Sequence, residues 1–154
     1  MRWDDPALHK LAGEFFRMFS RMEYALKAAG YLVPSRRNAE ADWTKFAIDI
    51  HEHFANIATE QLGKATTLLL TEPPKKQINN NGVVEWDTTP PDAKNQTDLL
   101  LRYVCRIRNN LFHGGKFNGR WFEPERSGPL IQEGIEVLSA CLQVSEKVNA
   151  AYHS

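Results

Sequence analysis

Apolar side chains recur at the spacing of an α-helix through most of the chain. The first such stripe consists of Phe15, Phe19, Met22 and Leu26, flanked by Phe16 and Met18. It predicts a helix from about residue 6 to residue 29, with this stripe in the core. Pro6 suits the first turn, Asp4 or Asp5 provides the N-cap, and Gly30 marks the end.

Further stripes predict the rest of a helical bundle. Helices are expected at about residues 40–62, 65–70, 92–112 and 128–152. The stripe of the second helix consists of Trp43, Phe46, Ile50, Phe54 and Ile57, and Ser127 is the expected cap of the last helix. Because no repeat or long heptad pattern is present, we expect one all-α domain over residues 1–154, a bundle of four to five helices.

Residues 73–93 interrupt the helical pattern. They hold four of the eight prolines, which disfavour helix and central strand alike. Asn81-Gly82 directly before a Val-Val pair suggests a small hairpin, but we expect the segment as a whole to be a long irregular loop. A second Asn-Gly pair, Asn118-Gly119, predicts a short tight turn before the last helix.

Composition and charge narrow the function classes. Of 154 residues, 42% are hydrophobic and 25% are charged, which excludes a fully disordered chain. Lys and Arg together number 19, as do Asp and Glu, so the formal net charge is zero. A protein that coats nucleic acid is usually basic overall, so any contact with nucleic acid must come from a local patch.

Cysteine usage and hydropathy indicate the cytoplasm. Cys105 and Cys141 are the only cysteines, and both lie in apolar helical patterns, so we expect free buried thiols, with a disulfide as the alternative. No apolar run approaches the roughly 18 to 20 residues of a membrane span, and the first residues lack the apolar core of a secretion signal. We therefore expect a cytoplasmic protein without a membrane partner.

The helix expected at residues 92–112 carries the candidate chemistry. Projected at about 100° per residue, it presents a core face of Leu100, Val104, Ile107 and Leu111 and, opposite, a polar stripe of Arg102, Arg106, Asn109 and His113. Arg108 lies off that stripe, on an apolar flank that also has the character of a subunit contact. In a regular helix Arg108 and His113 point about 140° apart. They meet only across a dimer, or if the helix breaks at Phe112-His113, which Gly114-Gly115 permits.

Arginine and histidine together suffice for one class of reaction. Arginine binds phosphate oxygens bidentately, and histidine moves protons near neutral pH. RNA carries its own nucleophile in the 2′-hydroxyl, so such a pair can cleave it without a metal or another cofactor, and none is expected here. The alternative is a solvated polar face whose terminal histidine suits the helix dipole.

The run Arg108-Asn109-Asn110-Leu111-Phe112-His113 resembles the R-x4-6-H signature of the HEPN superfamily. Extended through Gly114-Gly115-Lys116, it is similar to the motif of several bacterial HEPN families. The stretch from Arg21 to Lys27 resembles the acidic-aromatic segment that such families carry in their first helix. The specific motif is short, whereas the order of helices is similar over most of the chain.

This resemblance implies a fold, an assembly and an activity. The fold is a helical bundle, and two protomers pair so that both motifs face one cleft. Active relatives are metal-independent endoribonucleases that leave a cyclic phosphate, and many act as toxins or antiviral defence effectors. The expected partners are therefore RNA, a second copy of the chain in a homodimer, and an antitoxin or defence-complex protein. Other relatives are inactive modules that bind RNA or a protein in a larger complex, which is the main alternative; an unrelated helical interaction domain is another.

The resemblance also assigns roles by position. Arg108 is expected to hold the scissile phosphate, His113 to act as general acid or base, and Asn109 to orient one of them. Glu23 is expected to hold Arg108 or His113 in place, with a solvated surface carboxylate as the alternative. The expected contacts to the RNA backbone are Arg102, Arg106, Lys116 and Arg120. Some antitoxin-controlled relatives carry a tyrosine where this chain has Gly115, so a modification switch is not expected.

Overall fold

The computed structural model describes residues 5–112, 116–117, 120–121 and 124–154, with side chains described over 5–112 and 127–154. The helices are α1 (Pro6–Ala28), α2 (Trp43–Ala55), α3 (Glu60–Thr71), α4 (Gln96–Phe112), α5 (Pro124–Val144) and α6 (Glu146–Tyr152). Two antiparallel strand pairs accompany them, β1 (Lys76–Asn80) with β2 (Val83–Asp87) and β3 (Lys116–Phe117) with β4 (Arg120–Trp121). The expectation of an all-α bundle is confirmed, although the described residues form six helices and not the four to five predicted. Across the described residues no helix is long and apolar enough to cross a bilayer.

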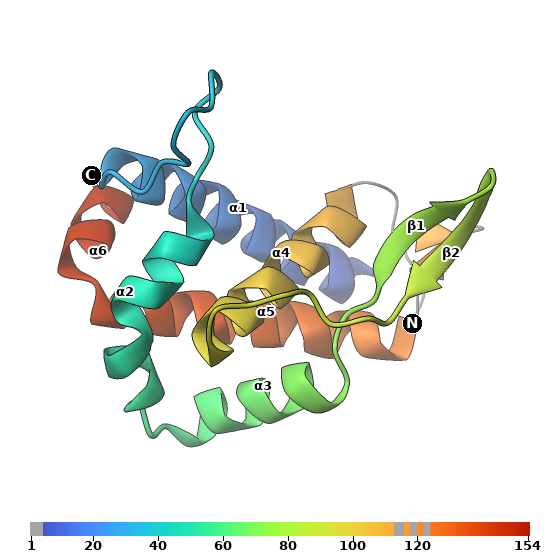
Figure 1. Ribbon diagram of the computed structural model, residues 1–154. Helices are drawn as coiled ribbons and strands as arrows, with labels where there is room; N and C mark the ends of the chain where they lie inside the picture. Colours follow the sequence, from blue (N-terminus) through green and yellow to red (C-terminus); the bar gives the residue numbers. More distant parts are fainter. Residues whose placement is uncertain (1–4, 113–115, 118–119, 122–123) are drawn as a thin grey trace.

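Helix α5 lies at the centre of the bundle and contacts each of the other helices. α1 packs along α5 and meets α6 near the end of the chain, while α2 packs against α4 (Figure 1). The core between them contains fully buried side chains from all six helices, among them Phe15, Phe46, Leu100 and Leu138. Burial of each such side chain contributes roughly 1.5–3 kcal/mol, which is what holds these helices together.

α1 and α5 approach closely at Gly134. A Cβ atom at this position would lie 2.9 Å from Cε2 of Phe15 and 3.6 Å from Cδ1 of Ile107. Glycine therefore allows the Phe15 ring to lie directly on the α5 backbone. The same contact includes α4 through Ile107, so it fixes where the helix with the candidate chemistry lies.

The predicted boundaries of α1 are confirmed to within a residue. Asp5 is the N-cap, since its carboxylate accepts a hydrogen bond from the backbone N–H of Ala7 at 2.8 Å. Gly30 follows the helix with a φ of 95°, a conformation that side chains disfavour. The predicted core stripe is buried, but Phe16 is wrong as a core residue. It is only partly buried, and its ring meets that of Phe112 edge-on, with 6.3 Å between centroids.

The prediction of one helix over residues 40–62 is wrong. α2 ends at Ala55, and Thr59 starts α3 as its N-cap, because its hydroxyl accepts a hydrogen bond from the N–H of Leu62 at 3.3 Å. The apolar pattern continues through the break, since Ile57 packs against the core from within the turn. The apolar periodicity therefore predicted one helix where the structure has two. The separate helix expected at 65–70 is part of α3.

The last helix also differs from its prediction. α5 begins at Pro124 rather than residue 128, so Ser127 lies inside the helix and does not cap it. Ser145 has extended backbone, with φ −128° and ψ 102°, and separates α5 from α6. A helix cannot continue through such a residue. α4 begins at Gln96, slightly later than predicted.

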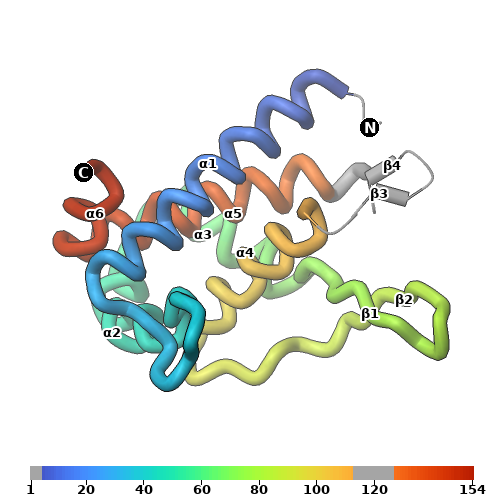
Figure 2. The backbone as a smooth tube through the Cα atoms, turned by 90° about the horizontal axis from the view of Figure 1, so that it is seen from above, coloured from blue at the N-terminus to red at the C-terminus, as the bar shows by residue number. Residues whose placement is uncertain are grey.

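Residues 73–93 contain the β1–β2 hairpin, so the prediction of a long irregular loop is wrong for residues 76–87, and the hairpin that Asn81-Gly82 suggests is present. Asn80 pairs with Val83 across the two-residue turn Asn81-Gly82, whose φ values are 51° and 85°. This kind of turn needs left-handed backbone at both positions, which Asn and Gly adopt most readily. The hairpin projects from the helical bundle, as Figures 1 and 2 show.

The stem of this hairpin is fastened to α4. The guanidinium of Arg106 donates hydrogen bonds to the carbonyl oxygens of Pro74 (3.5 Å) and Thr89 (2.9 Å), which lie on the two sides of the hairpin. The side-chain amide of Asn110 donates to the carbonyl oxygen of Lys75 at 2.8 Å. The hairpin thereby becomes a wall beside the polar face of α4.

Candidate functional site

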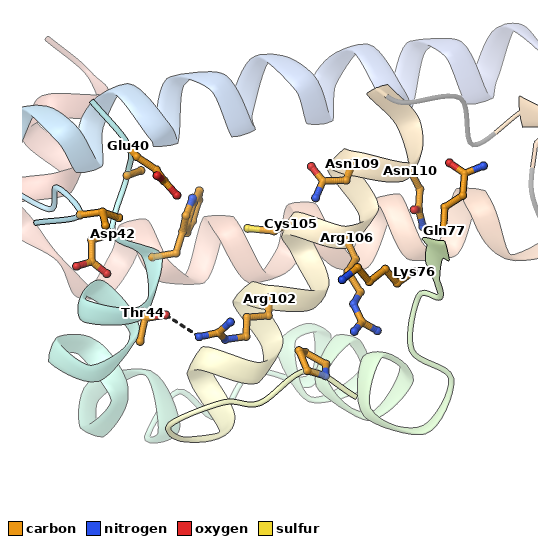
Figure 3. Close-up of a pocket in the computed structure, with 14 residues that line it drawn as sticks. Glu40, Asp42, Thr44, Lys76, Gln77, Arg102, Cys105, Arg106, Asn109 and Asn110 are labelled. Carbon is orange, nitrogen blue, oxygen red and sulfur yellow. Dashed lines mark hydrogen bonds between the residues drawn. The ribbon is translucent and has the colours of Figure 1, made fainter. Parts of the chain in front are cut away.

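A pocket of about 680 Å³ lies over the polar face of α4 (Figure 3). Its floor is α4, one wall is the segment that enters α2, and another wall is β1. The main lining side chains are Arg102, Cys105, Arg106, Asn109 and Asn110 from α4, Glu40, Asp42, Trp43 and Thr44 from the α2 side, and Lys76 and Gln77 from β1. Three members of the predicted polar stripe, Arg102, Arg106 and Asn109, therefore face one common space.

Arg102 is held by a buried carboxylate. Its Nε donates to Oδ1 of Asp98 at 3.2 Å, and its Nη2 donates to the hydroxyl of Thr44 at 3.0 Å. Asp98 is completely buried, and it also accepts hydrogen bonds from the Thr44 hydroxyl (3.3 Å) and the N–H of Lys94 (2.9 Å). A buried carboxylate needs such partners. Asp98 thus balances the positive charge of Arg102 within the protein. The Arg102 side chain also joins α4 to α2 through its hydrogen bond to Thr44.

Arg106 lies on the β1 side of the pocket. Besides its bonds to the hairpin stem, its guanidinium lies over the ring of Tyr103, 5.7 Å from the centroid. Burial lowers the pKa of Arg106, while Tyr103 and Asp87 oppose that shift, and arginine stays charged at neutral pH. Lys76 is exposed on β1, where it pairs in register with Asp87. The β1 side therefore carries two cations that a ligand in the pocket can reach.

Arg108 does not line the pocket, in agreement with the helical projection. Its guanidinium lies over the rings of Phe112, 4.7 Å from the centroid, and Phe19, 5.9 Å from the centroid. Its Nη1 donates to Oδ1 of Asn109 at 3.1 Å, and Asn109 also lines the pocket. Asn109 therefore connects the arginine of the motif to the pocket.

Glu23 and Arg108 both lie near Cys105. Burial, together with the negative charge of Glu23, raises the pKa of the Cys105 thiol to about 12, and the charge of Arg108 opposes the shift. The thiol is protonated at neutral pH, which excludes it as a nucleophile. Both cysteines are free, as predicted, and Cys141 is fully buried, but Cys105 is only partly buried. Among the described side chains, Glu23 forms no ion pair with Arg108.

Part of the predicted site lies outside the described residues. These gaps include 113–115, and with them His113, and also 118–119, where the tight turn is predicted. For Lys116 and Arg120 the structure describes the backbone, in the β3–β4 pair, and not the side chains. The roles expected of these three side chains stay predictions.

The pocket also contains side chains that the sequence did not single out. Trp43, predicted only as part of a core stripe, is partly buried and stacks on Phe19 with 5.2 Å between centroids, and it lines the pocket as well. Asn110 lies within the motif, so its position in the sequence could have identified it as a site residue. Gln77 and Glu40 come from segments far from α4 along the chain, and no sequence pattern connects them to it.

Comparisons with protein-family models, curated proteins and solved structures found no match to this chain.

Proposed function

We propose that the chain is a HEPN-type endoribonuclease that cleaves RNA without a metal, as a toxin or antiviral defence effector in the cytoplasm. The observation that carries the proposal is the hydrogen bond of 3.1 Å from Nη1 of Arg108 to Oδ1 of Asn109. It occupies one donor of the guanidinium, and stacking on Phe112 holds the group in place. An arginine fixed in this way keeps donors for a phosphate and loses little side-chain entropy on binding it.

The proposed reaction needs only two kinds of side chain. Arg108 binds the non-bridging oxygens of the scissile phosphate and stabilises the charge that develops on them. His113 removes the proton of the 2′-hydroxyl or protonates the leaving 5′-oxygen. The 2′-oxygen forms a bond to phosphorus and the bond between phosphorus and the 5′-oxygen breaks, which leaves a 2′,3′-cyclic phosphate and a 5′-hydroxyl.

The proposal includes a homodimer. In a regular helix Arg108 and His113 would point about 140° apart, so we propose that the motif of a second copy completes each site. An apolar surface, defined by Phe16, Tyr24 and Phe112, lies beside Arg108 and supports this arrangement. Phe112 is 62% exposed and Tyr24 is 53% exposed, and a cluster of exposed aromatic rings is typical of a protein contact surface.

Purified protein is expected to cleave single-stranded RNA in the presence of EDTA and to leave cyclic phosphate ends. His113→Ala should lower the cleavage rate by about 10²-fold or more, because general acid–base catalysis contributes about 10²–10⁴-fold. His53→Ala is the matched control, since His53 is an exposed histidine on α2, away from the motif. Cleavage by His113→Ala at the wild-type rate would falsify the proposed mechanism.

The same assay addresses the non-catalytic alternative. Arg106 and Lys76 line the pocket and could contact an RNA backbone without a catalytic histidine, which suits a module that binds without cleaving. RNA binding in a gel-shift assay, with no product and no effect of His113→Ala, would support that inactive module.

A further inference from the structure

We propose that the pocket over α4 binds one unpaired base of the RNA and prefers guanine. The inference rests on the proposed function and deepens it, because it identifies the nucleotide that brings the scissile phosphate to Arg108. The pocket volume of about 680 Å³ lies within the range of roughly 300–1,000 Å³ that is usual for small-molecule sites. Asn109 links the pocket to Arg108, so a base bound here has its own phosphates close to the motif.

Carboxamide side chains give the pocket both donors and acceptors. Asn109 uses its Oδ1 for Arg108, and Asn110 uses its Nδ2 for the carbonyl of Lys75. Nδ2 of Asn109, Oδ1 of Asn110 and both ends of the Gln77 amide are left for a ligand among the described contacts. Such groups pair with the polar edge of a base, whereas an anion alone would favour donors only.

Charge is distributed unevenly around the pocket. The two reachable cations, Arg106 and Lys76, lie on the β1 side, and Figure 3 shows Glu40 on the opposite wall. Arg102 does not change this distribution of charge, because the buried carboxylate of Asp98 balances its positive charge. A nucleotide has the same polarity, with a phosphate at one end and N–H donors on its base at the other. We therefore place the base toward Glu40 and one phosphate of its nucleotide on the β1 side, and the neighbouring phosphate, past Asn109, is the one that Arg108 holds.

Glu40 is the carboxylate that selects guanine. Its nearest charged partner is Arg36 at 3.8 Å, and both side chains are mostly exposed, so this pair is weak and replaceable. Asp42 is different, because its carboxylate already accepts a hydrogen bond from the N–H of Lys45 at 3.0 Å as the N-cap of α2. Guanine presents two adjacent donors, N1–H and the 2-amino group, to one carboxylate. Adenine, cytosine and uracil each offer a donor next to an acceptor, which a carboxylate repels.

Trp43 provides an apolar surface for the base. One face of its ring is stacked on Phe19, with an angle of 26° between the ring planes, and the residue also lines the pocket. Stacking of a base on an aromatic side chain is a common feature of single-strand recognition. Only an unpaired base can enter such a pocket, so the preferred RNA is single-stranded.

The test is calorimetric titration of the full chain with the four nucleoside monophosphates, as 3′ and 5′ isomers, and with inorganic phosphate. We expect GMP to bind about tenfold more tightly than the other three, and phosphate to bind more weakly than any of them, since one good bidentate contact discriminates bases by about this factor or more. Glu40→Gln should remove the preference for GMP. Glu60→Gln is the matched control, because Glu60 forms an equivalent exposed pair with Lys64 on α3, and it should bind as wild type does.

Three results overturn the inference: equal binding of all four nucleotides, binding of phosphate as tight as that of GMP, and a GMP preference that persists in Glu40→Gln. These experiments do not need cleavage, so they separate the pocket from the ribonuclease proposal. If GMP binds but RNA is not cleaved, the proposed guanine pocket stands and the proposed ribonuclease activity fails. If RNA is cleaved without a base preference and Glu40→Gln cleaves it at the same rate, the ribonuclease proposal stands and the guanine pocket fails.

Discussion

Asp98 places a carboxylate among apolar side chains, and its partners explain what Arg102 does. The carboxylate receives hydrogen bonds from Arg102, from Thr44 and from the backbone at the start of α4. On the sequence alone Arg102 is a candidate for RNA contact, because it shares a helix face with Arg106 and Asn109. In the fold Arg102 also neutralises the buried carboxylate of Asp98. A helical projection of the sequence cannot predict this role.

We expect Asp98→Ala to lower the free energy of unfolding by about 3 kcal/mol, because it leaves Arg102 and Thr44 without their buried partner. Urea denaturation followed by circular dichroism measures the change. Asp92→Ala is the control, since Asp92 is exposed in the loop before α4, and such a surface change stays within about 0.5 kcal/mol. If Asp98→Ala lowers the free energy of unfolding by less than about 1 kcal/mol, the contact to Asp98 is weak and Arg102 is available to bind RNA.

Helix packing depends on the absence of a side chain at Gly134. We expect Gly134→Ala to destabilise the protein by about 1–3 kcal/mol, because the new Cβ would lie 2.9 Å from the Phe15 ring. Gly13→Ala is the matched control: Gly13 is also inside a helix, with nothing within 4 Å of an added Cβ. It should stabilise by roughly 0.5–1 kcal/mol through helix propensity. Thermal unfolding of the two variants should shift in opposite directions, and shifts of the same sign would contradict this account.

Elements defined by local chemistry were predictable from the sequence, and helix breaks set by packing were not. α1 has a capping residue, one apolar face and a terminal glycine, and its boundaries are confirmed. The β1–β2 hairpin follows from the conformational preference of Asn81-Gly82. The break before Thr59 was missed because Ile57 continues the apolar pattern through the turn. Within the site, the grouping of Arg102, Arg106 and Asn109 was predictable because they lie on one face of one helix, whereas Trp43 joins them only through tertiary packing.

At the scale of the whole molecule, the proposed homodimer can be tested through its apolar surface. Phe112→Asp should convert the dimer to a monomer in light scattering and abolish RNA cleavage, because a carboxylate buried in an apolar interface carries a large desolvation cost. Val83→Asp is the control: Val83 is 60% exposed, comparable with Phe112, but lies at the tip of the hairpin. A dimer that tolerates Phe112→Asp would require a different surface for pairing.

The hairpin stem has a consequence for how the chain can vary. Arg106 binds both of its sides, at Pro74 and at Thr89, so the bundle is anchored to the base of the hairpin and not to its tip. The cost of closing a loop rises only slowly with its length. We therefore expect the hairpin to tolerate replacement: strands of other lengths, or a peptide inserted between Asn81 and Gly82, should leave the bundle intact while changing the surface beside the pocket.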